Sequence, residues 1–217
     1  SEKGKRCIIK TQSQEVFKSG QSKMMTYDGR YRLGCEGILY ILLEPFHPNN
    51  ELTESFYRCL QNRHFFKMIS YYERKDGMLP GIGSLLKFSE EEIFPVDEEN
   101  NSLSRNNSSP MATFSQTKSP CFQLIIIGTE NDAVQLCLFA FSTGWEVTII
   151  ASPKDPRNIT DFPGAKCVLS IDHTELSQMT FDDQTAIVVM THNFAADLCF
   201  LTALKNTHTL YKGLLGP

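Results

Sequence analysis

The chain has 217 residues, and its 21 Lys and Arg against 25 Asp and Glu give a net charge of −4. This length can bury the core of one or two domains, and a hydrophobic content of 41% is ordinary for a globular protein. The mild acidity argues against a nucleic-acid-binding protein, which usually carries a basic patch. The longest apolar runs, at 38–43 and 124–127, have strand length, and none approaches the roughly 18 residues of a membrane span.

The first 95 residues predict an N-terminal domain of mixed α/β structure. Residues 13–18 have the pattern of a helix end, and residues 23–27 have that of a strand. The apolar run at 38–44 predicts a buried strand, which Pro45 ends. Apolar residues at helical spacing predict a helix over 52–62, and the aromatic-rich segment 65–72 favours a further strand.

Residues 96–121 are predicted to form a flexible linker. Acidic clusters flank its start, and eight of the ten residues at 100–109 are Asn or Ser. This composition cannot bury enough apolar area to offset the entropy lost on ordering. We therefore expect a second domain to begin at 122 and to continue to 217.

Strand and helix patterns alternate in this second domain. The predicted strands lie at 122–127, 146–150, 168–170, 185–190 and from 209, and the predicted helices at 132–141 and 195–204. Such alternation implies right-handed crossovers and a parallel, Rossmann-like sheet. Continuous apolar runs are typical of strands that are covered on both faces. The fold class is therefore α/β, with a C-terminal Rossmann-like sheet and a smaller mixed α/β domain before it.

The seven cysteines are an odd number and lie far apart, without a Cys-x-x-Cys pair. This spacing argues against a zinc site of the usual type. Scattered single cysteines are typical of free thiols in a reducing compartment, and no signal-type apolar segment follows the charged start. We therefore expect a cytoplasmic protein.

Gly128 follows the first strand of the second domain, where a dinucleotide-binding fingerprint belongs. Instead of Gly-x-Gly-x-x-Gly/Ala, the sequence from 128 reads G-T-E-N-D-A. Glu130 replaces the glycine that lets a pyrophosphate approach the backbone, and it adds a like charge. The next strand ends without the acidic residue that would hold a ribose. We predict that NAD(P) does not bind tightly and that Gly128 serves the turn; a working nucleotide site is the alternative.

The motif Gly34-Cys35-Glu36-Gly37 leads into the predicted strand at 38–44. A cysteine framed by glycines would be accessible, and its thiolate is both a soft ligand and a nucleophile. A buried structural cysteine is the alternative, because that is the most common environment of this residue type.

Thr191 and His192 follow the predicted strand at 185–190. Ligands of open α/β sheets bind beyond the carboxyl ends of the strands, so His192 could contact a ligand or act as an acid or base. The alternative is that Thr191 or Asn193 caps the helix that follows.

Four motifs follow one another along the chain: L-G-C-E-G-I at 33–38 with L-E-P at 43–45, F-P-G-A at 162–165, D-D-Q-T-A-I-V-V-M-T-H at 182–192 and Y-K-G-L-L-G at 211–216. In this order they resemble the XdhC/CoxI family of maturation proteins for xanthine dehydrogenase and carbon monoxide dehydrogenase. Cys7 stands at about the spacing of an earlier family motif, although its neighbours differ. The family's turn usually reads Gly-Ala-Gly-His, and its final motif runs on further. We expect both domains to be truncated.

The resemblance implies an accessory factor rather than an enzyme, with no catalytic or metal site of its own. It would bind the molybdenum cofactor (molybdopterin) transiently, through Cys7, Gly34, Cys35, Glu36, Gly37, Gly128, Thr191 and His192. Its implied partners are a cysteine desulfurase, which sulfurates the cofactor, and an apo xanthine dehydrogenase-type hydroxylase, which receives it. Neither nucleic acid nor membrane is expected as a partner, and a homodimer is left open. The alternatives are an NAD(P)-dependent oxidoreductase and an interaction scaffold that binds no cofactor.

Overall fold

The computed structural model describes residues 2–28, 37–99 and 111–216, with side chains from Ile9 onward in the first helix. The chain divides into two compact units, Ser1–Ser119 and Pro120–Pro217. The N-terminal unit is therefore the longer one, whereas the sequence predicted a smaller first domain. The reason is that residues assigned to the linker complete its structure.

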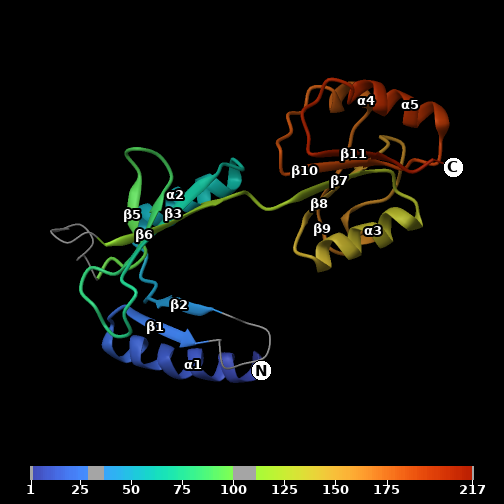
Figure 1. The fold of residues 1–217 in the computed structure, drawn as a ribbon. Coiled ribbons are helices and arrows are strands. Elements are labelled where there is room, and N and C mark those ends of the chain that lie inside the picture. Colours follow the sequence, from blue (N-terminus) through green and yellow to red (C-terminus); the bar gives the residue numbers. More distant parts are fainter. Residues whose placement is uncertain (1, 29–36, 100–110, 217) are drawn as a thin grey trace. The chain divides into compact units, whose positions relative to one another are not determined.

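In its described residues, the N-terminal unit combines two antiparallel sheets with two helices (Figure 1). The sheets are the pair β1-β2 and a four-stranded sheet in the order β5-β4-β3-β6. This arrangement confirms the predicted mixed α/β character. In chain order the elements are α1 (Glu2–Ser19), β1 (Lys23–Asp28), β2 (Ile38–Leu43), α2 (Asn50–Gln61), β3 (Phe66–Tyr72), β4 (Gly83–Lys87), β5 (Ile93–Pro95) and β6 (Ala112–Lys118).

Strand β6 corrects part of the predicted linker. It pairs antiparallel with the whole of β3, from Phe66 opposite Lys118 to Tyr72 opposite Ala112. Its sequence is mostly polar, but a sheet edge is completed by backbone N–H and C=O groups, which polar residues supply as well as apolar ones. Of the predicted linker 96–121, residues 100–110 lie outside the described part of the chain.

Strand β2 has the predicted position but not the predicted burial. It pairs with β1 in a two-stranded sheet, and Ile38, Leu39 and Tyr40 are 40%, 47% and 38% exposed. The core of this unit lies elsewhere, around Leu52 of α2 and Leu86 of β4, with Phe side chains packed against them. An apolar run predicts a strand, whereas its burial depends on which elements cover it.

The C-terminal unit is built on a parallel five-stranded sheet in the order β11-β10-β7-β8-β9. Helix α3 covers one face of the sheet, and α4 and α5 cover the other (Figure 1). This is the predicted Rossmann-like arrangement. Its elements are β7 (Gln123–Ile127), α3 (Asn131–Ser142), β8 (Glu146–Ala151), a 3-10 turn (Ile159–Asp161), β9 (Ala165–Ser170), α4 (His173–Leu176), β10 (Thr185–Val189), α5 (Phe194–Ala203) and β11 (Tyr211–Leu214).

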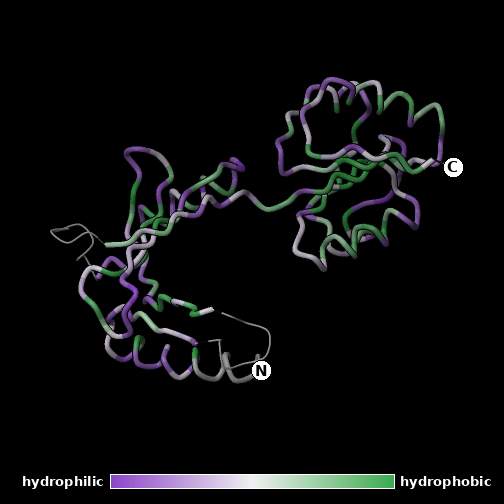
Figure 2. The backbone as a smooth tube through the Cα atoms, viewed as in Figure 1, coloured by the Kyte–Doolittle hydropathy of each residue, from purple (hydrophilic) through white to green (hydrophobic). Residues whose placement is uncertain are grey.

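The central strand β7 is buried on both faces. Leu124 and Ile126 pack in the core under α3, and Ile125 and Ile127 pack in the core under α4 and α5. Successive side chains of a strand point to opposite faces, so a strand between two helical layers needs an unbroken apolar run. The hydrophobic stretches of the tube in Figure 2 accordingly include these inner strands.

Within the described residues, no helix combines the length and the apolar character that crossing a membrane requires.

Candidate functional site

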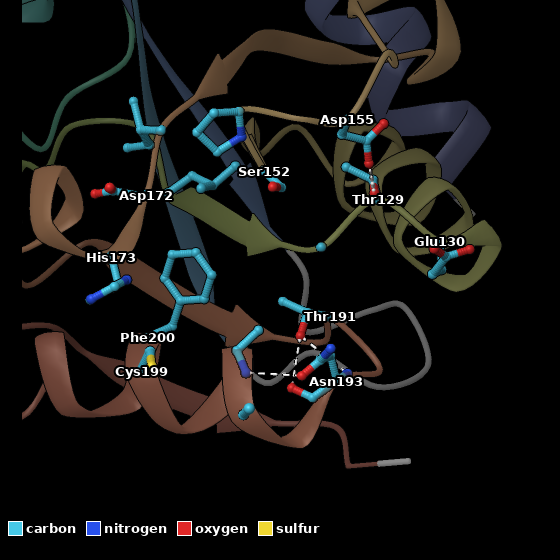
Figure 3. A pocket seen from close by; sticks show the side chains of 16 residues that line it. Thr129, Glu130, Ser152, Asp155, Asp172, His173, Thr191, Asn193, Cys199 and Phe200 are labelled. Atoms are coloured by element: carbon cyan, nitrogen blue, oxygen red, sulfur yellow. Dashed lines mark hydrogen bonds between the residues drawn. The ribbon is translucent and has the colours of Figure 1, made fainter.

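A pocket of about 520 Å³ opens at the carboxyl ends of the parallel strands in the C-terminal unit (Figure 3). Strands β7 and β10 are neighbours, but the chain leaves them toward opposite faces of the sheet, so the pocket lies at the topological switch point. We call this hollow the Rossmann pocket. Its polar and aromatic walls are formed by Thr129, Glu130, Ser152, Asp155, Asp172, His173, Thr191, Asn193, Cys199 and Phe200, with Gly128 at the turn after β7.

Gly128 is required by the turn itself. Its φ is +137°, and a Cβ atom at this position would lie 2.3 Å from the carbonyl oxygen of Met190. No side chain fits at that distance, and L-residues avoid that backbone conformation. The geometry supports the interpretation in which Gly128 makes the turn from strand to helix, although it also lines the pocket.

Glu130 occupies the N-cap position of α3 without making a side-chain capping hydrogen bond. Its carboxylate instead accepts a hydrogen bond from the guanidinium of Arg157, with 3.3 Å between the two atoms. The nearby cation is therefore already paired. Among the described residues that line the pocket, none is Lys or Arg.

Two further carboxylates keep the pocket negative. Asp155 accepts hydrogen bonds from the Thr129 hydroxyl and from the backbone N–H of Arg157, and these bonds lower its pKa. Asp172 accepts from the backbone N–H groups of Glu175 and Thr174, which lower its pKa in the same way. Both groups are therefore ionised at neutral pH.

The opposite wall of the pocket is aromatic and carries a thiol. The rings of His173 and Phe200 meet edge to face, with 6.3 Å between their centroids, and the exposed Cys199 precedes Phe200 on α5 (Figure 3). The sequence reasoning missed this wall and both carboxylates. One signal was available for Asp172, because Asp-x-x-Glu after a strand predicts a capped helix start. The remaining residues reach the pocket only because the fold brings segments together that are distant in the sequence.

The candidate site residues that follow β10 have different roles in the structure. Thr191 lines the pocket, and its hydroxyl donates to the buried carboxylate of Asp197 at 2.6 Å. Asn193 caps α5 by accepting from the N–H of Ala196, so the predicted alternative of a helix cap is confirmed at this residue. His192 does not belong to the described pocket lining; its Nε2 atom lies 2.7 Å from a carboxylate oxygen of Asp132.

The predicted N-terminal site residues are less fully described. Gly37 is exposed and directly precedes β2, with open space where a Cβ would be. Gly34, Cys35 and Glu36 lie outside the described residues, and Cys7 lies in α1 with its side chain outside the described part. In the described ranges, no three His, Cys, Asp or Glu side chains are placed to hold a metal ion.

A family model of the XdhC Rossmann domain matches residues 124–217, from the first parallel strand to Pro217. The C-terminal unit belongs to the XdhC family. The match confirms the resemblance that the sequence motifs predicted, and it agrees with the strand order of the sheet.

The fold of the chain is similar to the crystal structure of a xanthine dehydrogenase from Bacillus halodurans, with a TM-score of 0.75 and 20% sequence identity. The likeness covers 97% of this chain and 66% of that one, so this chain spans just under two thirds of that protein's length. At this identity the likeness shows the fold alone. No curated protein matches the sequence.

The XdhC Rossmann pocket is poorly suited to a pyrophosphate. The start of α3 offers a positive helix dipole, but three carboxylates, Glu130, Asp155 and Asp172, face the same space, and the nearby cation, Arg157, is engaged with the first two. Like charges a few ångströms apart repel by several kcal/mol at an effective dielectric constant of about 20. That NAD(P) does not bind tightly remains a prediction, and this charge distribution supports it.

Proposed function

We propose that the protein is a maturation factor for a xanthine dehydrogenase-type hydroxylase. It binds the molybdenum cofactor transiently, assists its sulfuration by a cysteine desulfurase, and delivers it to the apo-hydroxylase. The observation that carries the proposal is the match of residues 124–217 to the XdhC Rossmann domain. A role in binding and transfer requires no catalytic residues in this chain.

The charge of the cofactor indicates where it binds. Molybdopterin carries a phosphate, and the acidic lining of the Rossmann pocket does not fit that group. We therefore place the cofactor at the N-terminal unit, where the resemblance assigns Cys35 and its flanking glycines to the site. When bound, the cofactor supplies the molybdenum and dithiolene chemistry, and the chain supplies a soft thiol beside it.

The test uses the full chain, purified from cells grown with molybdate. Wild-type protein is expected to carry molybdenum and pterin and to activate the apo-hydroxylase in the presence of the desulfurase. Cys35→Ser is expected to keep the melting temperature while both readouts fall, because Ser is nearly isosteric with Cys but is a poor soft ligand. Cys121→Ser, at an exposed cysteine, is the matched control and should change neither.

Two results would contradict the proposal. Wild-type protein without molybdenum, pterin or any effect on the hydroxylase would indicate the interaction scaffold instead. A large fall in the melting temperature of Cys35→Ser, with cofactor still bound, would assign Cys35 a structural role.

A further inference from the structure

A second hollow, of about 310 Å³, lies within the N-terminal unit between the β1–β2 hairpin and the strands β3 and β6. Its volume is at the lower end of the range for small-molecule sites. We call it the aromatic groove. Its lining includes Tyr40, Leu42, Ser70, Tyr72, Arg74 and Phe114.

The pleat of the strands explains how the groove is built. Tyr40 and Leu42 are two residues apart on β2 and therefore lie on one face of the hairpin. Ser70 and Tyr72 lie in the same way on one face of β3, and Phe114 of β6 is paired in register with Ser70. Two strand faces thus form the two walls.

The groove leaves aromatic surface exposed to water. Tyr40 is 38% exposed and Phe114 is 53% exposed. These exposed rings line a hollow of small-molecule size, and covering apolar surface stabilises a complex by about 25 cal/mol per Å². Aromatic walls favour a flat ring in particular, because rings gain from stacking and edge contacts.

Arg74 adds a positive charge at the groove. Its guanidinium carbon lies 5.8 Å from the centroid of the Tyr40 ring, and the side chain is exposed. It forms no ion pair with another residue that the structure describes, and the described groove lining contains no Asp or Glu. The neighbouring carboxylate of Asp76 already accepts hydrogen bonds from the backbone and hydroxyl of Thr26. A planar guanidinium binds phosphate oxygens through two parallel hydrogen bonds.

We propose that the aromatic groove binds a planar heteroaromatic ring that carries a phosphate, of the pterin or purine class. The ring lies between the Tyr40 wall and the Phe114 wall, and the phosphate binds Arg74. The assignment to the pterin of the molybdenum cofactor rests on the proposed function. In the sequence, the Gly34–Gly37 motif ends directly before β2, which supplies one wall of the groove.

The binding test uses guanosine 5′-monophosphate, with guanosine as the probe that lacks the phosphate, in calorimetric titrations of the full chain. Wild-type protein should bind the nucleotide with a Kd below about 1 mM and guanosine about tenfold more weakly. Arg74→Gln should weaken nucleotide binding to the guanosine level and leave guanosine unchanged. Phe114→Ala should weaken both ligands.

Lys67→Gln is the matched control for charge. Lys67 lies three residues before Ser70 on β3, so it is on the opposite strand face, and it is exposed like Arg74. Its substitution should leave both affinities unchanged. Phe200→Ala, in the Rossmann pocket, should also leave them unchanged. The groove assignment is wrong if neither probe binds, if Phe200→Ala abolishes binding, or if Arg74→Gln and Lys67→Gln act alike.

Molybdenum and pterin content separates this inference from the proposed function. If the nucleotide binds as expected but protein from molybdate-fed cells carries no molybdenum, the groove is a site for a purine-type ligand and the maturation role is wrong. If wild-type, Arg74→Gln and Phe114→Ala proteins all carry the same molybdenum and pterin, the cofactor binds elsewhere. Melting temperatures of the variants should remain at the wild-type value apart from a small loss for Phe114→Ala.

Discussion

The Rossmann pocket and the aromatic groove are both hollows beside sheets, but their chemistry is opposite. The pocket contains Glu130, Asp155 and Asp172 and no described lining cation, whereas the groove contains Arg74 and no described lining acid. The hollow at the position expected for a ligand in this fold is thus the one that repels a phosphate. Topology places a hollow, while the side chains decide what it can hold.

The two hollows also have different structural origins. The Rossmann pocket is fixed by strand order, because the turns after β7 and β10 must diverge from neighbouring strands. The aromatic groove exists because the face of a two-stranded sheet is left uncovered. Substitutions that disturb the turn after β7 should therefore act through stability, whereas substitutions of side chains that only line a hollow should act through binding. The following predictions test this difference within the C-terminal unit.

The largest expected effect is on the stability of the C-terminal unit. Gly128→Ala should reduce the free energy of unfolding by on the order of 3 kcal/mol, because its methyl group would collide with the Met190 carbonyl oxygen. Gly144→Ala is the control, since φ is also positive there but the space around it is empty. It should cost only about 1 kcal/mol, from backbone strain. Denaturant unfolding measures the free energy of unfolding of both variants. Equal losses would show that the close contact with the Met190 carbonyl oxygen adds nothing to the backbone strain.

A smaller effect is expected on nucleotide affinity in the Rossmann pocket. The wild-type protein should bind NAD only with a Kd above about 1 mM, and Glu130→Gly should tighten binding about tenfold. The substitution removes one negative charge and the ion pair of Glu130 with Arg157, which keeps its contact with Asp155 at 4.0 Å. Titration calorimetry measures both values. Low-micromolar NAD binding by the wild-type protein would overturn the electrostatic account of the pocket.

The same comparison shows what could be predicted from the sequence. The runs at 124–127 and 38–43 look alike, and both form strands as predicted. Only β7 is buried, because helices cover both faces of its sheet, whereas β2 has a single partner strand. The apolar run itself sets the tendency to form a strand, whereas the burial of its side chains depends on elements that are distant in the sequence. Strand β6 shows the converse, since its polar sequence forms a strand through backbone pairing with β3.

The candidate site was predictable only where a rule links a residue to a strand end. Thr191 follows β10 and lines the pocket, as the position of ligands in open sheets predicts. Asp155 and Phe200 come from a loop and from a helix, and only the assembled fold brings them to the same space. Arg74 was missed for the same reason, because its position over Tyr40 requires the hairpin to pack beside β3.

A loss of about 1 kcal/mol in the free energy of unfolding is expected from a substitution at the acidic wall of the pocket, and this loss should depend on pH. Thr129→Val removes the hydroxyl that lowers the pKa of Asp155. A carboxyl whose pKa is lowered by folding stabilises the protein above its unfolded pKa, and this stabilisation is lost as pH falls through the folded value. The loss caused by Thr129→Val should therefore be full at neutral pH and shrink below about pH 4.

The control for that profile is Thr143→Val. The hydroxyl of Thr143 donates to the carbonyl oxygen of Ala140 at 2.7 Å, and neither group titrates. Its loss should therefore stay constant over the same pH range in urea unfolding. Parallel profiles for the two variants would mean that the hydrogen bond from Thr129 does not lower the pKa of Asp155.

The smallest expected effect is at His192, which lies beside the Rossmann pocket. Its contact with Asp132 joins two side chains that are 39% and 36% exposed, and exposed pairs contribute only about 0.2–1 kcal/mol. His192 has a φ of 54°, a conformation that Asn tolerates well, so His192→Asn removes the ring contact without adding backbone strain. A double-mutant cycle with Asp132→Asn separates the pair from the interaction of Asp132 with the α3 dipole. The coupling energy should be below about 1 kcal/mol, and in the assay of the proposed function His192→Asn should leave activation of the apo-hydroxylase unchanged. If activation falls while stability does not, His192 contacts the cofactor or the client protein, and the acidic Rossmann pocket takes part in transfer after all.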